Sequence, residues 1–593
     1  MNTSTSYRTH MCAQLNEDNI NQEVKLSGWV QKWRDLGGVT FIDLRDRSGI
    51  VQIVFDESDN AEAAKLASTL RNEYVIQVCG NVVKRAEETI NPNLPTGTIE
   101  VKCHSLKVLD AAQTPPIYID DSDTSKESIR LKYRYLDLRK QNMKHSIMMR
   151  HKVTSFVRNF LDDEGFIDIE TPMLTKPTPE GARDFLVPSR VQKGSFFALP
   201  QSPQLYKQIL MVSGFDRYYQ IVKCFRDEDL RQDRQPEFTQ IDMELSFVNE
   251  EDIMDTNERM VAALFKKFKG IDISLPLKKM PYKEAMERFG SDKPDTRFGF
   301  ELVDVKEVFK NTGFKVFADN IAKGGDIRAI NAKGCGESFS RREIDALVEY
   351  VKIYKAKGLS WVKVTDDGIK SPIEKFLSDE EINQLLVTTN AEPDDLILIV
   401  GDKPSIVFDA LGHLRLELAR KLEIEYDREY DFLWVTDFPL FEYSEEENRY
   451  MAKHHPFTCP REEDIPLMES NPGAVRAKAY DMVVNGVEMG GGSIRIHNKE
   501  LQEKMFAALG FTKENAEEQF GFLLEAFKYG TPPHGGIAFG LDRMMMLLLD
   551  IDNIREVIAF PKTQNHGCLM TSAPGPAKEE SLVELGIELD LEN

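Results

Sequence analysis

Two carboxylates on either side of a tight turn are the first residues in this chain that could do chemistry. The segment 479–497 reads AYDMVVNGVEMGGGSIRIH, and Asn-Gly between apolar runs is the strongest short signal for a β-hairpin. A two-residue turn would pair Val483 with Glu488, and Asp481 with Gly490. Asp481 and Glu488 would then be diagonal neighbours about 7–8 Å apart, where both could bind a hard cation such as Mg²⁺.

Three glycines follow this carboxylate pair, at 490–492. Glycines within a strand favour the close approach of a ligand or another backbone, which argues against the alternative of an exposed acidic strand face. Strict alternation would place Arg495 on the face opposite Glu488. A bulge at the glycines would return Arg495 to the Glu488 face, and both arrangements stay open at this point.

A second candidate hairpin covers residues 216–247. Strand parity places Arg226 and Glu228 on one face. In the returning strand, FTQIDMELSF, we assign one face to the core and expect the other to be polar. The core face is Thr239, Ile241, Met243, Leu245 and Phe247, and the other is Phe238, Gln240, Asp242 and Glu244. An aromatic ring on an otherwise polar face favours a planar ligand; the alternative is an ordinary amphipathic hairpin with a polar surface.

A third element could bind anions. In PPHGGIAFGLDRMMMLLL (532–549), small residues precede a helix that should begin near Gly540 and carry Arg543 in its first turn. A helix N-terminus with an arginine favours anions, although a buried helix after a glycine-rich loop is the alternative. The segment matches neither the GxxxxGK[ST] phosphate loop nor a GxGxxG dinucleotide motif.

Two shorter segments carry polar pairs. In ALPQSPQLYKQILM (198–211), Ser202 fits a helix N-cap, so Gln204 and Lys207 would share a helix face; a solvated pair is the alternative. His454 and His455 are adjacent, and neighbours in a strand point in opposite directions. This disfavours a metal site built from both histidines.

Composition limits the class of protein. The 593 residues are 41% hydrophobic and 29% charged, which suits several folded domains. We expect no membrane-spanning segment and no signal peptide, and seven scattered cysteines without a CxxC suit a reducing cytosol. The net charge of −23 disfavours nucleic-acid binding. Residues 125–152 are the exception, with nine Lys or Arg against two acids; they form either a solvated helix face or a phosphate-contacting hinge.

The order of predicted elements divides the chain. Short alternating runs between residues 24 and 108 indicate a small β-barrel or sandwich. Helices and strands mix from about residue 140, and the motifs above skip 291–420, which we interpret as an inserted domain. The predicted parts are 1–112 (barrel), 113–140 (hinge), 141–290 and 421–560 (two halves of a catalytic domain), 291–420 (insert) and 561–593 (C-terminal extension).

Together these motifs resemble those of a known family. GFIDIETPML (165–174), the 225–238 segment and GIAFGLDR (536–543) resemble motifs 1, 2 and 3 of class II aminoacyl-tRNA synthetases. TPEGARDF (178–185), QSPQLYK (201–207), RQPEFTQID (234–242), HHPF (454–457) and GGGSIRIH (490–497) are similar to bacterial-type aspartyl-tRNA synthetases, of subclass IIb. The resemblance implies a multidomain α+β protein with an N-terminal OB-fold barrel, an antiparallel-sheet catalytic core and an inserted α+β GAD domain. It also implies a cytoplasmic homodimer joined at motif 1.

The resemblance implies an activity and roles for particular residues. The enzyme would activate L-aspartate with ATP and Mg²⁺ to aspartyl-adenylate, release pyrophosphate, and transfer aspartate to the 3′ end of tRNA(Asp). Arg226 and Arg543 would be catalytic, and Asp481 and Glu488 would bind the metal. Aspartate would contact Glu180, Gln204, Lys207, Arg226, Asp242, His454 and Arg495, with help from His455. ATP would contact Arg226, Asp227, Glu228, Gln235, Phe238, Glu488, Gly540, Leu541, Asp542 and Arg543. The anticodon would contact Arg34, Phe41, Gln52 and Glu100.

Other readings compete with this one. An asparaginyl- or lysyl-tRNA synthetase is disfavoured by the cationic pair Arg495 and Lys207. A tRNA-independent asparagine synthetase would need no barrel. A non-catalytic RNA-binding paralogue would have no reason to keep all five of Arg226, Glu228, Asp481, Glu488 and Arg543. Leu36 stands where members that also charge tRNA(Asn) often carry histidine, so we favour tRNA(Asp) alone. To reconcile the acidic charge with RNA binding, we expect tRNA to contact Arg130, Lys132 and Arg134.

Overall fold

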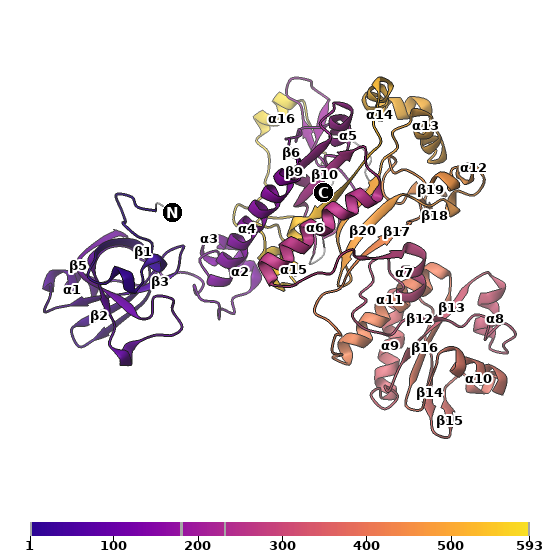
Figure 1. Cartoon of the computed structure of the whole chain (residues 1–593), viewed down its shortest axis with the longest axis horizontal. Coiled ribbons are helices and arrows are strands. Elements are labelled where there is room, and N and C mark those ends of the chain that lie inside the picture. The colour runs from indigo at the N-terminus through magenta and orange to yellow at the C-terminus, as the bar shows by residue number, and fades with distance from the viewer. Residues whose placement is uncertain (1–2, 178–181, 231–232, 591–593) are drawn as a thin grey trace. The chain divides into compact units, whose positions relative to one another are not determined.

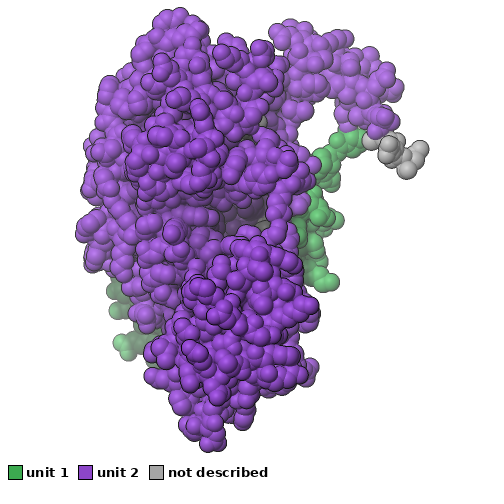
Figure 2. Space-filling model, turned by 90° about the vertical axis from the view of Figure 1, so that its right-hand side faces the viewer, with its two compact units in different colours: residues 1–151, 555–576 green, residues 152–554, 577–593 purple. Residues whose placement is uncertain are grey.

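The computed structural model describes residues 3–177, 182–230 and 233–590. The chain forms two compact units, coloured separately in Figure 2. The first comprises residues 1–151 and 555–576, and the second comprises 152–554 and 577–593. In the described residues, no helix is both long and apolar enough to cross a bilayer.

The first unit contains a closed five-stranded barrel, drawn in indigo in Figure 1. Its strands follow the order β1-β2-β3-β5-β4. They are β1 (Glu23–Leu36), β2 (Val39–Arg45), β3 (Ile50–Asp56), β4 (Val75–Lys84) and β5 (Ile99–Asp110), with α1 (Ala61–Ala67) between β3 and β4. Alternate residues of β1 fill the barrel, as a period of two requires. Gly37 and Gly38, both at positive φ, make the β1–β2 turn. The predicted barrel is confirmed.

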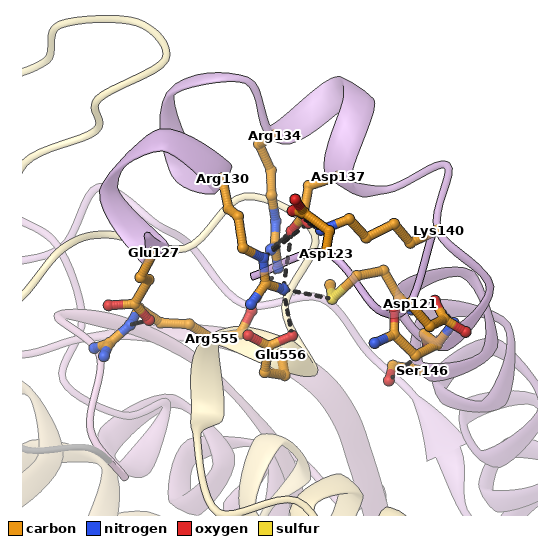
Figure 3. A network of polar contacts seen from close by, with 12 residues as sticks. Asp121, Asp123, Glu127, Arg130, Arg134, Asp137, Lys140, Ser146, Arg555 and Glu556 are labelled. Carbon is orange, nitrogen blue, oxygen red and sulfur yellow. Dashed lines mark hydrogen bonds and ion pairs between the residues drawn. The ribbon is translucent and has the colours of Figure 1, made fainter. Parts of the chain in front are cut away.

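Part of the basic stretch of the first unit forms a largely buried network of ion pairs, shown in Figure 3. It includes α2 (Glu127–Lys132), α3 (Arg134–Asp137) and the start of α4 (Gln141–Asp163). Asp137 is fully buried and pairs with Arg130, Arg134 and Lys140 at 2.6–2.9 Å. Burial would raise the pKa of Asp137, but hydrogen bonds from Arg130 and Lys140 hold it below its usual value.

Arg134 also joins this cluster to the 555–559 segment of the same unit. Its guanidinium donates to the carbonyls of Arg555, Ile558 and Ala559 at 2.5–2.9 Å, and Arg130 pairs with Glu556 at 2.9 Å. Our expectation of an RNA-contacting basic face is therefore wrong for Arg134, which is 2% exposed, and Arg130 is also committed to acids. The reason is that a buried carboxylate needs neighbouring cations. Lys132 is exposed.

The second unit is built on an eight-stranded sheet of order β11-β17-β20-β21-β22-β10-β9-β6. The pairs from β17 to β9 are antiparallel, and the two edge strands pair in parallel. In sheet order the strands are Lys278–Pro281, Phe432–Thr436, Ala479–Val484, Val487–Ile494, His534–Gly540, Glu237–Ser246, Arg217–Phe225 and Ile167–Asp168. The predicted antiparallel core is confirmed. Phe247, predicted to be in the core, is 72% exposed because the strand ends at Ser246 and Phe247 has a φ of 57°.

Helices support this sheet. α15 (Leu541–Leu549) packs on β10 and on α6 (Glu250–Lys269), and α5 (Gln204–Val212) packs on β9 and β10. Gly540 is the N-cap of α15, as predicted. α5 has Pro203 as its N-cap, one residue after the expected Ser202, whose hydroxyl accepts from the Gln204 amide. The other helices and hairpins here are β7 (Leu186–Pro188), β8 (Phe196–Ala198), α7 (Tyr282–Phe289), β18 (Phe441–Ser444), β19 (Arg449–Ala452), α12 (Leu467–Ser470), α13 (Lys499–Ala508), α14 (Lys513–Ala526) and α16 (Glu579–Leu585).

A second, five-stranded sheet lies between residues 302 and 402, in the order β12-β13-β16-β14-β15. Its strands are Leu302–Asp304, Asp326–Ala332, Leu396–Asp402, Ser360–Thr365 and Gly368–Lys370. The helices are α8 (Lys315–Ala322), α9 (Arg341–Ile353), α10 (Asp379–Thr388) and α11 (Pro404–Lys421). Residues of β13 are buried on both faces, and alternate residues join two different hydrophobic clusters. The sheet is therefore sandwiched between two apolar layers.

Candidate active site

A cavity of about 500 Å³ opens on the antiparallel sheet of the second unit. Its floor follows one register row across four strands, in which Asp242 faces Ala538, Ala538 faces Gly491, and Gly491 faces Asp481. Direct partners in an antiparallel pair project to the same face. The row therefore places an acidic residue at each end, with two small residues between them that leave room for a substrate.

A β-bulge fixes the face of Arg495. In the β20–β21 hairpin, Val483 pairs with Glu488, but Asp481 pairs with Gly491 rather than with the predicted Gly490. The extra residue restores Arg495 to the face of Asp481 and Glu488, because a bulge shifts the alternation by one position. The question that the sequence left open is thus answered by the bulge.

The two carboxylates of this hairpin form an oxygen-rich corner. A Cβ on Gly491 would lie 2.6 Å from Asp481 Oδ1 and 3.4 Å from Glu488 Oε1, so glycine keeps space for both groups. Burial and the neighbouring Glu488 raise the pKa of Asp481 well above its usual value. Hard oxygen donors suit Mg²⁺. Among the described residues, no group of three His, Cys, Asp or Glu side chains could cage a metal, so phosphate or water would complete the coordination.

The opposite end of the floor holds a buried ionic cluster. Lys207 Nζ, on α5, donates to Asp242 Oδ2 at 2.9 Å and lies 3.3 Å from Glu244. Arg495 donates to Glu244 at 3.0 Å. Asp242 Oδ1 is buried without a hydrogen-bond partner. Burial raises the pKa of Asp242 to about 6, against the lowering effect of Lys207. This end therefore offers two cations and one unsatisfied carboxylate oxygen.

The β9–β10 hairpin and α15 supply groups suited to a nucleotide. The Arg226 guanidinium lies 5.1 Å from the centre of the Phe238 ring, within the range of a cation–π contact. Arg234 pairs with Glu228 at 3.2 Å, and Arg543 pairs with Asp233 at 3.2 Å. These side chains line the same cavity as the carboxylate corner, so a planar base and a polyphosphate could be bound together there.

The two adjacent histidines both line the cavity, although we expected at most one to face it. His454 and His455 lie outside the regular strands, so strand alternation does not separate them. Burial, with Lys453 nearby, lowers the pKa of His454 to about 4, so this ring is neutral at pH 7. His455 is held against Arg495 at 2.6 Å. It follows that His455 positions the arginine.

Most predicted site residues meet in this cavity, and a few do not. The residues that line it are Gln204, Lys207, Arg226, Glu228, Gln235, Phe238, Asp242, His454, Asp481, Glu488, Arg495, Gly540, Asp542 and Arg543. Asp227 is not among its lining residues, and Leu541, 1% exposed, is a core side chain. Asp542 accepts a hydrogen bond from the Thr239 amide at 2.9 Å and so joins α15 to β10. Glu180 lies outside the described residues.

Three charged groups in or beside the cavity could not be predicted from local sequence patterns. Glu244 was placed on the correct strand face, but its burial depends on residues far away in the chain. Asp233 lies in the loop between β9 and β10, where residue spacing gives no signal. Lys293 lies 3.4 Å from Glu488, 195 residues away in sequence. No local pattern could have found that contact.

On the barrel of the first unit, the four predicted anticodon residues come from neighbouring strands. Arg34 and Phe41 are register partners on β1 and β2. Arg34 donates to Gln52 at 3.2 Å, and Gln52 donates to Glu100 at 2.8 Å. The Arg34 side chain is half exposed, and Phe41 is partly exposed. The barrel thus carries one polar network beside an accessible ring.

The barrel and the antiparallel sheet with its polar cavity together define the class of this protein. The model of "tRNA synthetases class II (D, K and N)" matches residues 126–564, and the chain belongs to that family. An OB-fold nucleic acid binding domain matches residues 24–109. The predicted family and fold class are confirmed.

More particular relatives carry the name of one amino acid. An aspartate–tRNA(Asp/Asn) ligase of Geobacillus sp. is 58% identical, over 99% of this chain and 98% of its own length. An aspartate–tRNA ligase of Ruminiclostridium cellulolyticum is also 58% identical, over 98% of each chain. Among solved structures, the asparaginyl-tRNA synthetase of Pyrococcus horikoshii complexed with asparaginyl-adenylate has a TM-score of 0.58 at 18% identity. It covers 93% of this chain and 98% of its own. At that identity the likeness concerns the fold alone.

Proposed function

We propose that this chain is an aspartate–tRNA ligase that activates aspartate with ATP in the cavity, releasing pyrophosphate, and then transfers the aspartate to tRNA. The names of the relatives support the amino acid and the ligase activity. The observation that carries the proposal is the meeting of Lys207 and Arg495 at one end of the cavity floor. Two fixed cations suit a side-chain carboxylate, and an arginine can bind it through two parallel hydrogen bonds.

The same end of the cavity would also bind the ammonium group of aspartate. Asp242 keeps one carboxylate oxygen without a partner, and Gln204 lies in the same lining. Neutral His454 and the positioned His455 would complete the pocket for the amino acid. Lysine would place its cation against Lys207 and Arg495, and asparagine would bring no negative charge to these two cations. Both alternatives are therefore disfavoured by charge.

The other end would hold ATP. Phe238 would stack on the adenine, Glu228 would accept from it, and Gln235 and Gly540 lie in the same lining. Arg226 would bind the α-phosphate and Arg543 the γ-phosphate. Asp481 and Glu488 would hold Mg²⁺, which supplies charge neutralisation for the phosphates when bound. The corner formed by the Asp481 and Glu488 carboxylates suits a hard cation that keeps phosphate and water as its other ligands.

The first reaction needs positioning more than a general base. The aspartate α-carboxylate attacks the α-phosphorus of ATP, and the bond to the bridging oxygen breaks as pyrophosphate leaves. Arg226 would hold the phosphate as negative charge spreads over its oxygens, and such fixed electrostatic contacts are each worth about 10²–10³ in rate. In the second reaction, the terminal ribose hydroxyl of tRNA attacks the aspartyl carbonyl and AMP leaves.

Several finer assignments belong to the same proposal. The barrel would bind the anticodon of tRNA(Asp), with Phe41 stacking on a base, as OB folds do with single strands. The protein would act as a homodimer in the cytoplasm, with residues 165–174 at the interface and 291–420 as the insert. Leu36, exposed at the end of β1, supports charging of tRNA(Asp) alone. The relatives carry both kinds of name, so charging of tRNA(Asn) has to be measured.

ATP–pyrophosphate exchange with aspartate, asparagine and lysine tests the proposal. Exchange should occur with aspartate and Mg²⁺, and stay near background with the other two amino acids. Exchange driven by asparagine or lysine would mean that the Lys207–Arg495 end has been misassigned. Absence of exchange in folded protein would instead support a non-catalytic RNA-binding role.

A further inference from the structure

Lys293 is a cavity residue that the proposed reaction does not use. It follows α7 in the segment SDKPDTR (291–297) and lines the cavity beside the carboxylate corner. Its Nζ lies 3.4 Å from Glu488 Oε2 and 3.7 Å from Asp292. The Lys293 ammonium group therefore lies next to Glu488, one of the two residues proposed to bind the metal.

The backbone around Lys293 is firmly held. Pro294 follows it, and a residue before proline is restricted to extended conformations. Asp295 is 5% exposed, and its two carboxylate oxygens accept from Arg297 at 2.7–2.9 Å. A Cβ on Gly486, in the turn of the β20–β21 hairpin, would lie 3.1 Å from Asp295 Cβ. The segment is therefore packed against the hairpin that carries Asp481 and Glu488.

The carboxylate corner needs a compensating charge when it holds no metal. Asp481 is buried beside Glu488, and two carboxylates at such a site repel each other. Lys293 supplies one positive charge to this pair. Its side chain is 44% exposed, and an ion pair with this exposure is weak. A weakly paired cation can offset part of the negative charge of the corner and still be displaced.

We propose that Lys293 is a built-in counter-ion that competes with the divalent cation for Glu488 when no nucleotide is bound. The inference rests on the proposed function, because that function places the metal at Asp481 and Glu488. Its consequence is that the empty enzyme binds divalent cations poorly, and metal is gained together with the phosphates of ATP. Lys293 is a positioning residue in this account, since it acts through Glu488.

Mn²⁺ titration of the full chain without nucleotide, followed by electron paramagnetic resonance of the unbound ion, tests this competition. Lys293→Met should bind Mn²⁺ about fivefold to tenfold more tightly than the wild type, because one repelling charge is removed. Lys293→Arg keeps the charge and should resemble the wild type. Lys283→Met is a matched control, because Lys283 lies on α7 and is 84% exposed. The double variant Lys293→Met/Glu488→Gln should lose the added affinity.

Equal Mn²⁺ affinity in the wild type and Lys293→Met would overturn the inference, as would tight binding that survives Glu488→Gln. Melting temperatures in EDTA establish that each variant is folded, and Lys293→Gln serves as the second neutral variant if Lys293→Met is not. The titration involves no turnover. Failure of aspartate-dependent exchange in the wild type would therefore count against the proposed function, and the Mn²⁺ result alone would decide the role of Lys293.

Discussion

Arg495, directly after β21, forms a buried ion pair at 3.0 Å with Glu244 on β10. The two strands are not neighbours, since β22 lies between them. The arginine side chain therefore reaches over β22, where Gly536 faces Glu244 in the register. A Cβ at Gly536 would lie 2.0 Å from Glu244 Oε2, so glycine is needed beneath this pair.

Replacement of this arginine separates its two roles. Arg495→Gln should lower kcat/KM for aspartate by about 10²–10³. It should also destabilise the second unit by about 3 kcal/mol, because Glu244 keeps only Lys207 as a buried cationic partner. In Arg495→Gln/Glu244→Gln, stability should recover but activity should not. Kinetics and thermal melting of the three proteins measure this, and recovery of both properties would contradict the assigned contact with substrate.

Gly491→Ala tests the carboxylate corner. The added Cβ would lie 2.6 Å from Asp481 Oδ1, so one carboxylate must move. We expect the apparent affinity for Mg-ATP to fall by about tenfold or more, with a smaller change in the KM for aspartate. Gly358→Ala is the matched control, because nothing lies within 4 Å of its Cβ position. ATP and aspartate titrations in the exchange assay provide the measurement; equal losses for both substrates would argue against a local effect.

The pH profile should report Asp242. Its carboxyl must be ionised to bind an ammonium group, and burial raises its pKa to about 6. Therefore kcat/KM for aspartate should decline below about pH 6. The linked stability has the opposite sign: between pH 4 and 6 the folded state binds more protons than the unfolded state, so this group contributes less stability as pH rises. An aspartate profile that stays flat down to pH 5 would disprove the assignment, and Asp242→Asn should remove the inflection from the residual activity.

Arg134→Ala should destabilise the first unit even when no RNA is present. The change leaves three backbone carbonyls and part of Asp137 without partners, at a cost of about 3 kcal/mol or more. Lys132→Ala, at an exposed neighbouring position, should leave the melting temperature nearly unchanged. Thermal melting of both variants without tRNA makes the comparison. Similar melting temperatures would mean that the Figure 3 network contributes little.

Phe41→Ala tests the barrel. Loss of one stacked base costs about 1–3 kcal/mol, so kcat/KM for tRNA(Asp) should fall by about tenfold to a hundredfold. Aspartate-dependent exchange without tRNA should not change, because it takes place in the second unit. Phe41→Tyr retains the ring and should behave like the wild type. A loss of exchange in Phe41→Ala would point to a general loss of folded protein and not to a defect in anticodon binding.

Local signals in the sequence predicted a small β-barrel or sandwich, two hairpins and several residues that line the cavity, and the family resemblance supplied the antiparallel core. The Asn485-Gly486 turn placed Asp481 and Glu488 on one face, because a two-residue turn fixes the register next to it. The predicted pairing of Asp481 with Gly490 was wrong by one residue, because nothing in the sequence indicated the position of the bulge. The prediction that Arg134 is a surface cation was wrong. Its partners include backbone carbonyls more than 400 residues away in the chain, and composition cannot indicate such contacts.

The register row from Asp242 to Asp481 has a consequence for how such an enzyme can diverge. In the proposed function, the amino-acid end of this row lies on β10 and the metal end on β20. Their row residues are separated by more than 230 positions in the chain but by only two strands in the sheet. Substitutions at one end leave the backbone of the other untouched. A single-residue insertion in β22 or β21 would place the two ends of the row on opposite faces of the sheet. We therefore expect that single substitutions can change the substrate preference of this sheet, whereas insertions or deletions within these strands would disrupt the site.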